Sequence, residues 1–435
     1  MIYEFHHLVP TPPRYLTTLF HFFTISPISM SRVVITGMGI YSVIGQNLSE
    51  VKDSLMQGKS GIIFDPVRKE MGFRSALTGM VSRPQLKGVL DRRMRIGLPE
   101  QGEYAYISTL EALKHAGIEQ SYLDAHEVGI LFGNDSSALP VVESVDILRQ
   151  KKDTMMIGSG YIFQSMNSTV SMNLSVIFRL KGVNFTLSGA CASGSHAIGI
   201  GYLLIKQGLQ EMIICGGAQE INPESTASFD ALNAFSIRES EPTRASRPFD
   251  RDRDGLVPSG GAATVIIESY ESAMKRGATI YGEVIGYGFS SNGEHISMPN
   301  VEGPVRAMQK AIQDAGIKSS EIDYINAHAT STPAGDSNEA KSINTVFGSS
   351  RPLVSSTKSM TGHEMWMGGA SEVIYSTLMM NNGFVAPNIN LDHPDEVTAK
   401  LNIATKTTPF EINAFLSNSF GFGGTNSSLI IRKSR

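Results

Sequence analysis

The chain has little cysteine, a single tryptophan and no excess of positive charge. Only two of its 435 residues are cysteine. Two cysteines cannot build a disulfide framework, and they suit a protein of the reducing cytoplasm. The formal net charge of −4 gives no overall basic field, so nucleic acid is not expected as a partner. No run of about 18 uncharged apolar residues occurs, so no membrane insertion is predicted.

Residues 1–29 differ in character from the rest of the chain. They contain the rigid stretch "PTPP" and the acidic Glu4, and they lack the basic start and small-residue cleavage site of a signal peptide. We interpret 1–29 as a disordered leader or the product of a misassigned start. The fold is expected to begin near Ser31.

Apolar, β-rich runs alternate with helical patterns along the whole chain. Such alternation predicts an α/β protein with a parallel or mixed sheet. The expected strands lie at 32–40, 127–134, 184–188, 211–220, 262–269, 281–289, 322–329, 352–357 and 428–433.

Two pairs of segments resemble each other in the same order. Residues 109–134 and 307–330 each read as a helix closed by Ala-Gly-Ile and followed by a strand. Residues 184–208 and 352–383 each read as a strand, a small polar turn and a helix that ends at glycine. The repeat predicts a duplicated unit, with the chemistry where equivalent turns meet.

One cysteine lies in an unusual setting. Cys191 occurs in "SGACASG" (188–194), directly before an apolar helix. A helix N-terminus favours a thiolate, and small neighbours let backbone N–H groups and an acyl group approach the sulfur. An inert buried cysteine is the alternative. That alternative describes Cys215, which lies inside the strand "MIICGGA".

Three further stretches carry candidate chemistry. His328 follows a buried strand in "NAHATSTPAGD", and "STKSMTGHEMW" places Lys358 and His363 in the turn equivalent to that of Cys191. The glycine-rich "SNSFGFGGTNSSL" (417–429) is either a loop that presents an N–H to an oxyanion or a plain tight turn. No ligand spacing within these stretches predicts a metal site.

The four stretches, in this order, resemble the β-ketoacyl-acyl carrier protein synthases of the KAS I/II branch. The stretches "ASRPFDRDRDGLVPSGGAA" and "APNINLDHPDE" resemble that family too, and the similarity covers about residues 31–434. It implies the thiolase-like fold, two duplicated halves in a five-layer α/β/α/β/α arrangement. We place the halves at 30–277 and 278–435. The family is usually dimeric and acts on acyl carrier protein. For this chain we expect a homodimer in the cytoplasm, without a cofactor or metal.

The resemblance also implies residue roles. Cys191 resembles the nucleophile that takes the acyl group, and His328 and His363 resemble the pair that binds the malonyl thioester and promotes decarboxylation. The backbone amides of Cys191 and Phe422 would form an oxyanion hole, with the Phe422 ring as a gate. The other implied site residues are Lys358, Asp336 and Glu339 in the active-site network, Thr330, Thr332 and Phe420 at the substrate, and Arg92, Arg93 and Arg95 for carrier docking.

The segment after His363 departs from the family. Small residues are usual there, whereas this chain has "EMWMGG", with Trp366 either filling core or shaping the acyl channel. The departure puts in doubt only the assignment to fatty acid synthesis. A ketosynthase of a specialised polyene or polyketide pathway is the main alternative.

Three other functional classes remain open from the sequence. One is a chain-length-factor-like subunit without catalysis, which would lack the nucleophile. Another is a cysteine hydrolase. The third is a dinucleotide-dependent oxidoreductase, suggested by Gly37 and Gly39 after a strand, although Ser42 stands at the third glycine position.

Overall fold

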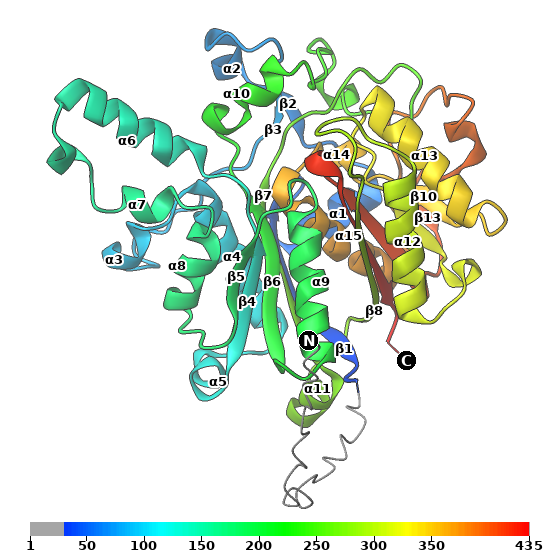
Figure 1. Ribbon diagram of the computed structural model, residues 1–435, viewed down its shortest axis with the longest axis horizontal. Coiled ribbons are helices and arrows are strands. Elements are labelled where there is room, and N and C mark those ends of the chain that lie inside the picture. The colour runs from blue at the N-terminus through cyan, green and yellow to red at the C-terminus, as the bar shows by residue number, and fades with distance from the viewer. Residues whose placement is uncertain (1–29, 435) are drawn as a thin grey trace, which may run out of the picture.

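The computed structural model describes residues 30–434 and contains a continuous sheet of eleven strands surrounded by helices (Figure 1). The leader interpretation of residues 1–29 therefore lies outside the described residues. The strands of this sheet are β1 Val33–Ser42, β4 Val128–Gly133, β5 Asn184–Leu187, β6 Met212–Gln219, β7 Gly261–Ser269, β8 Gly282–Ser291, β9 Tyr324–Asn326, β10 Leu353–Ser355, β12 Asn402–Ile403, β14 Ala414–Phe420 and β15 Thr425–Arg432.

Two halves of the sheet repeat one topology. The first half has the order β5-β4-β6-β7-β1, and the second has β10-β9-β14-β15-β8. In both, the first three strands pair in parallel and the last two pair antiparallel. The halves join where β1 and β8 pair antiparallel. The predicted duplication is therefore confirmed by strand order and direction.

The helices complete a five-layer arrangement. Helix α4 packs on β1 and β7, and α12 packs in the same way on β8 and β15. Helices α9 and α15 lie between the two halves, where they contact each other and strands of both halves. This is the thiolase-like α/β/α/β/α fold that the sequence predicted. The helices are α1 Leu48–Gln57, α2 Pro66–Glu70, α3 Arg92–Arg95, α4 Glu100–His115, α5 Gln120–Ala125, α6 Ala138–Lys151, α7 Tyr161–Gln164, α8 Thr169–Ile177, α9 Ser193–Lys206, α10 Pro223–Ala231, α11 Tyr270–Arg276, α12 Glu302–Ala315, α13 Pro333–Phe347, α14 Lys358–Thr361 and α15 Gly368–Asn382.

The predicted helix ends have the expected backbone geometry. Gly117 after α4 and Gly316 after α12 both have φ of 64°, the left-handed conformation that ends a helix at low cost only at glycine. The sequence predicted a loop or tight turn over 417–429, but much of this stretch belongs to strands. Strand β14 continues to Phe420 and β15 begins at Thr425, so only the glycine-rich segment between them leaves the sheet.

The glycines that suggested a dinucleotide site serve packing instead. Gly37 and Gly39 lie inside β1, under α4, and not in a strand-to-helix turn. A Cβ at Gly39 would lie 2.0 Å from the Ser108 carbonyl oxygen, and one at Gly37 would lie 2.7 Å from that of Ala112. The helix can sit this close to the strand only without side chains there. The dinucleotide interpretation of this stretch is therefore wrong.

The middle layer of helices explains why α9 is apolar and why Cys215 is buried. Helix α9 is apolar on most faces because sheets flank it on both sides, and Gly201 lets it approach Cys215, whose sulfur would be 2.6 Å from an added Cβ. Cys215 is thus a core residue, as predicted.

Within residues 30–434, no helix combines the length and apolar character that crossing a membrane requires.

Candidate active site

The site forms where the two middle-layer helices begin. Cys191 lies two residues before α9, and His363 lies in the turn before α15. Gly194 and Gly369 face the opposite helix start: a Cβ at Gly194 would lie 2.9 Å from a backbone carbonyl oxygen of the facing turn, and one at Gly369 would lie 2.5 Å from a backbone nitrogen of α9. Because neither glycine has a side chain, the N-terminal ends of α9 and α15 approach closely, and Cys191 comes into contact with His363.

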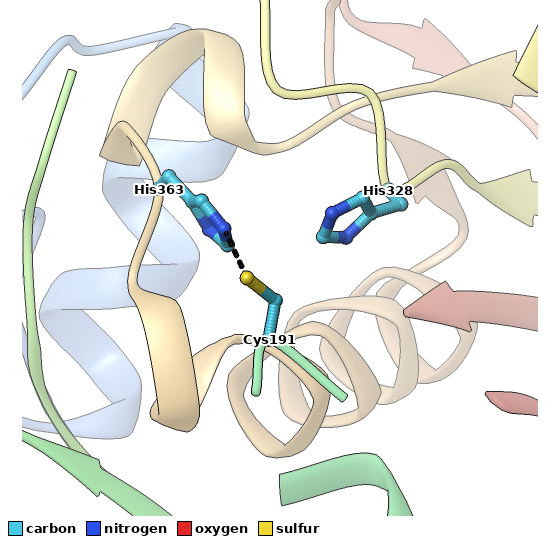
Figure 2. A group of neighbouring side chains, drawn as sticks. All are labelled: Cys191, His328 and His363. Carbon is cyan, nitrogen blue, oxygen red and sulfur yellow. Dashed lines mark hydrogen bonds between the residues drawn. The ribbon is translucent and has the colours of Figure 1, made fainter. Parts of the chain in front are cut away.

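The turn before α9 aims the cysteine side chain at this partner. Ala190 has φ of 46°, a left-handed conformation that is strained for a residue with a side chain. Asp135 fixes the turn by accepting a 2.9 Å hydrogen bond from the Ala190 N–H. The Cys191 Sγ then lies 3.0 Å from His363 Nε2 (Figure 2). A nucleophile within hydrogen-bond reach of a base is the arrangement that nucleophilic catalysis needs.

The environment of Cys191 corrects one prediction from the sequence. Burial raises the pKa of its thiol to about 12, although the Lys358 charge and the backbone N–H groups of Cys191 and Phe422 act in the opposite direction. The helix start alone therefore does not make the thiolate available, because desolvation outweighs it. His363, in contact with the sulfur, is placed to take the proton.

His328 reaches the same cavity from the second half of the sheet. It follows β9, and Glu339 in α13 holds this turn by accepting the backbone N–H of His328 at 2.9 Å and that of Ala329 at 2.6 Å. The rings of His328 and His363 meet edge to face, with centroids 5.3 Å apart (Figure 2). Burial and the Lys358 charge lower the pKa of both imidazoles well below the usual value, so both are neutral.

Lys358 lies behind the cavity and acts through its charge. Its ammonium group forms a buried ion pair with Glu372 of α15. Burial raises the pKa of Glu339 and of Glu364 to about 7, and that of Glu372 to about 8. Sequence analysis missed Glu372, since nothing local links it to a lysine 14 positions earlier.

A cavity of about 450 Å³ collects most of the predicted site residues. Asp336 lies outside it: its carboxylate accepts the Phe249 N–H at 2.8 Å and lies 3.7 Å from Arg253. Asp336 therefore supports the start of α13 and does not face substrate. The predicted residues that line the cavity are Cys191, His328, Thr330, Thr332, Glu339, His363, Phe420 and Phe422.

The glycine-rich segment places an amide and a ring at the sulfur. The Phe422 N–H acts on the Cys191 sulfur together with the Cys191 N–H, which is the pair of donors that an oxyanion hole requires. The Phe422 side chain is 38% exposed and stacks on Phe229 at a centroid distance of 5.9 Å. Phe229 was not found from the sequence, because it lies in α10, which carries no recognised motif.

Trp366 packs directly behind the nucleophile. It is 8% exposed and belongs to one apolar cluster with Cys191, Phe235 and Met365. Its indole Nε1 donates to Ser136 Oγ at 3.1 Å. Trp366 does not itself line the cavity, but its ring centroid lies 6.4 Å from that of Phe229, which does.

The predicted docking arginines form the short helix α3. Arg92 and Arg93 are exposed, whereas Arg95 is half-buried and donates to the Leu90 carbonyl oxygen at 3.0 Å. Figure 1 shows α3 beside α7 and α8, well apart from α13 at the cavity. Only Arg92 and Arg93 are thus free to meet a partner, and Arg95 has a structural contact.

The duplicated five-layer fold, with a cysteine and two neutral histidines where its halves meet, defines a thiolase-like enzyme. Residues 30–273 match the N-terminal domain of the β-ketoacyl synthases, and residues 281–392 match their C-terminal domain. The chain belongs to the β-ketoacyl synthase family.

Individual relatives agree over nearly the whole chain. The chain is 40% identical to 3-oxoacyl-[acyl-carrier-protein] synthase 1 of Escherichia coli K12, over 93% of this chain and 99% of that protein. It is similar to the crystal structure of a β-ketoacyl synthase from Burkholderia phymatum STM815, with a TM-score of 0.89, 35% identity, and coverage of 93% and 100%. A type II polyketide synthase ketosynthase, solved with its acyl-carrier protein, gives a TM-score of 0.83 at 29% identity, with the same coverage.

Proposed function

We propose that this protein is a condensing enzyme of fatty acid synthesis. It takes an acyl group from acyl carrier protein onto Cys191 and joins it to malonyl-carrier protein, giving 3-oxoacyl-carrier protein and CO₂. The observation that carries the proposal is the 3.0 Å contact between Cys191 Sγ and His363 Nε2, in a cavity that His328 also lines.

The first half-reaction is transfer of the acyl group. The Cys191 sulfur attacks the thioester carbonyl carbon, and the N–H groups of Cys191 and Phe422 stabilise the oxyanion that forms. His363 takes the thiol proton and delivers it to the sulfur of the departing carrier. Protons and charge balance, so neither a redox partner nor a cofactor is involved.

The second half-reaction needs a carbanion equivalent without a strong base. The malonyl group loses CO₂ and leaves an enolate, whose oxygen accepts hydrogen bonds from the N–H groups of the two histidines. For this step His363 carries its proton on Nε2, the tautomer opposite to the one that accepts the thiol proton. The enolate carbon then attacks the acyl carbon on Cys191 and expels the sulfur as a thiolate, which takes up one proton from solvent and restores the thiol. Thr330 and Thr332, whose hydroxyl oxygens lie 3.1 Å apart in the cavity wall, suit contacts with the carrier's pantetheine arm.

Incubation with acyl- and malonyl-carrier protein tests this proposal. A 3-oxoacyl product, with one CO₂ released for each, is expected. Release of free fatty acid without condensation would instead identify a cysteine hydrolase. Absence of an acyl adduct would fit a chain-length-factor-like subunit, although the placement of Cys191 and His363 argues against that class.

The surface around β5 supports a homodimer. Among residues 30–434, strand β5 ends the sheet and pairs only with β4, and Phe185 on it is 58% exposed. An unpaired apolar edge is normally covered, and two copies related by a twofold axis can pair such edges in a closed assembly. We propose that two β5 strands pair in this way.

We further propose the cytoplasm as the compartment, because both cysteines are free thiols.

Carrier docking on α3 predicts a charge-dependent effect. Replacing Arg92 and Arg93 by glutamate is expected to raise the KM for carrier-bound substrate about tenfold or more, because carrier proteins are acidic and steering depends on charge. A free pantetheine thioester should be used as before. Lys275→Glu, which reverses the charge of an exposed residue on α11, is the matched control. Equal loss with both substrates would refute docking at α3.

Trp366 is expected to limit the length of the acyl group. Trp366→Ala removes the ring behind Cys191, so acyl loading should shift toward longer chains, while the free energy of unfolding falls by about 3–5 kcal/mol. Intact-mass analysis with a series of acyl-carrier proteins, together with melting temperature, measures both. Trp366→Phe, which keeps an aromatic ring, should change the profile less. A lower melting temperature with an unchanged chain-length profile would show that Trp366 only fills core.

A further inference from the structure

Three metal-ligand atoms of different segments meet at the cavity. They are the Cys191 sulfur and one ring nitrogen each of His328 and His363, and all three lie within 4.8 Å of one another (Figure 2). We infer that this Cys–His–His group binds Zn²⁺, and that the ion reversibly blocks the nucleophile. No segment contributes more than one ligand, so no spacing in the sequence indicates the site.

The geometry is close to that of a tetrahedral zinc site. Zn–S bonds of about 2.3 Å and Zn–N bonds of about 2.0–2.1 Å separate neighbouring ligand atoms by about 3.5 Å. Cys191 Sγ and His363 Nε2, now 3.0 Å apart, would separate slightly. The three atoms lie within 4.8 Å of one another, so His328 would approach the other two by at most about 1.3 Å.

The donor set selects the metal. One thiolate and two imidazoles suit zinc and related transition metals, whereas Mg²⁺ and Ca²⁺ require oxygen ligands. Each imidazole can offer the ion the lone pair of its unprotonated ring nitrogen. Binding displaces the Cys191 proton to solvent, which leaves a zinc thiolate and one released H⁺ and makes the affinity fall at lower pH.

The surroundings indicate reversible binding. All three residues line the 450 Å³ cavity, so the ion has an entry path and a fourth position open to water. Histidines in tight sites usually donate their second ring N–H to a protein acceptor. Within residues 30–434, Nδ1 of neither His328 nor His363 has a hydrogen-bond partner. The site therefore lacks the hydrogen bonds to its histidine ligands that are usual in a permanent metal centre.

The occupied site excludes acyl transfer. A thiolate bound to zinc shares an electron pair with the ion and is a weaker nucleophile, the ion takes up space beside the sulfur, and an acylated sulfur is a poor metal ligand. Zinc and the acyl group thus compete for one atom.

The experiment measures metal binding by the full chain without any acyl substrate, so its outcome does not depend on the proposed condensation. Titration with Zn²⁺ is expected to give one ion per chain. Co²⁺ should give the absorption of a tetrahedral cobalt thiolate. Alkylation of Cys191 by iodoacetamide should slow at least about tenfold with zinc and recover with EDTA.

Variants assign the ligands. Cys191→Ser should abolish the cobalt thiolate band. His328→Ala and His363→Ala each remove a ligand, so each should weaken binding by at least the roughly 10–100-fold that loss of an outer-shell partner costs. Cys215→Ser is the matched control and should bind as before. Binding that persists unchanged in a Cys191→Ser, His363→Ala double variant would place the ion elsewhere, for example at the histidines of residues 1–29. That result, or no binding at millimolar Zn²⁺, would overturn the inference.

Discussion

Replacing Cys191 by serine is expected to abolish the acyl-enzyme. The serine hydroxyl is far less acidic than a thiol, and the site is buried enough to raise even the thiol pKa to about 12. Acyl loading should fall on the order of 10⁶-fold, as it does when a hydrolytic triad loses its nucleophile. Intact-mass analysis after incubation with acyl-carrier protein should show no adduct, with an unchanged melting temperature.

Cys215→Ser is the matched control for this result. Cys215 lies inside β6, packed against Gly201 and away from the cavity, so its replacement should leave acyl loading intact. An adduct that survives in Cys191→Ser and disappears in Cys215→Ser would reverse the assignment of the nucleophile.

Replacing His328 by alanine is expected to separate the two half-reactions. His328 lines the cavity, but the hydrogen-bond partner of the Cys191 sulfur is His363. His328→Ala should therefore still accept an acyl group and then condense about 10²–10³-fold more slowly, since losing one preorganised donor costs about 2.7–4 kcal/mol. His328→Asn, which keeps an N–H donor, should recover part of the rate of condensation.

His363→Ala provides the contrast. The sequence treats the two histidines as a pair that acts on decarboxylation, but the 3.0 Å contact with Cys191 gives His363 a part in acyl loading as well. Two rates should fall in this variant. One is the rate of acyl loading, measured by intact-mass analysis, and the other is the rate of CO₂ release from malonyl-carrier protein. If both alanine variants slowed both steps equally, the distinction between the two histidines would be wrong.

Much of the fold could be predicted from local patterns. The nine expected strands, the glycine-terminated helices and the repeated segments all follow from apolar periodicity and from backbone conformations open only to glycine. Strands β12 and β14 of the sheet were missed. Strand β12 is only 2 residues long, and the run "AFLSNSF" of β14 is partly polar, so that its burial depends on the strands beside it. The boundary near residue 277 stays a prediction.

The sequence by itself determined the order of elements and which residues stand at their turns. It placed Cys191 before α9, and Lys358 and His363 in the equivalent turn before α15, because helix starts and strand ends are set by neighbouring residues. Only the tertiary structure decided what these turns meet. Cys191 and His363 are 172 positions apart, and they touch because bare glycines let α9 and α15 approach. Packing also raised the pKa of Cys191, put Trp366 behind the sulfur and gathered three metal-ligand atoms, since burial and distance depend on segments that no local pattern connects.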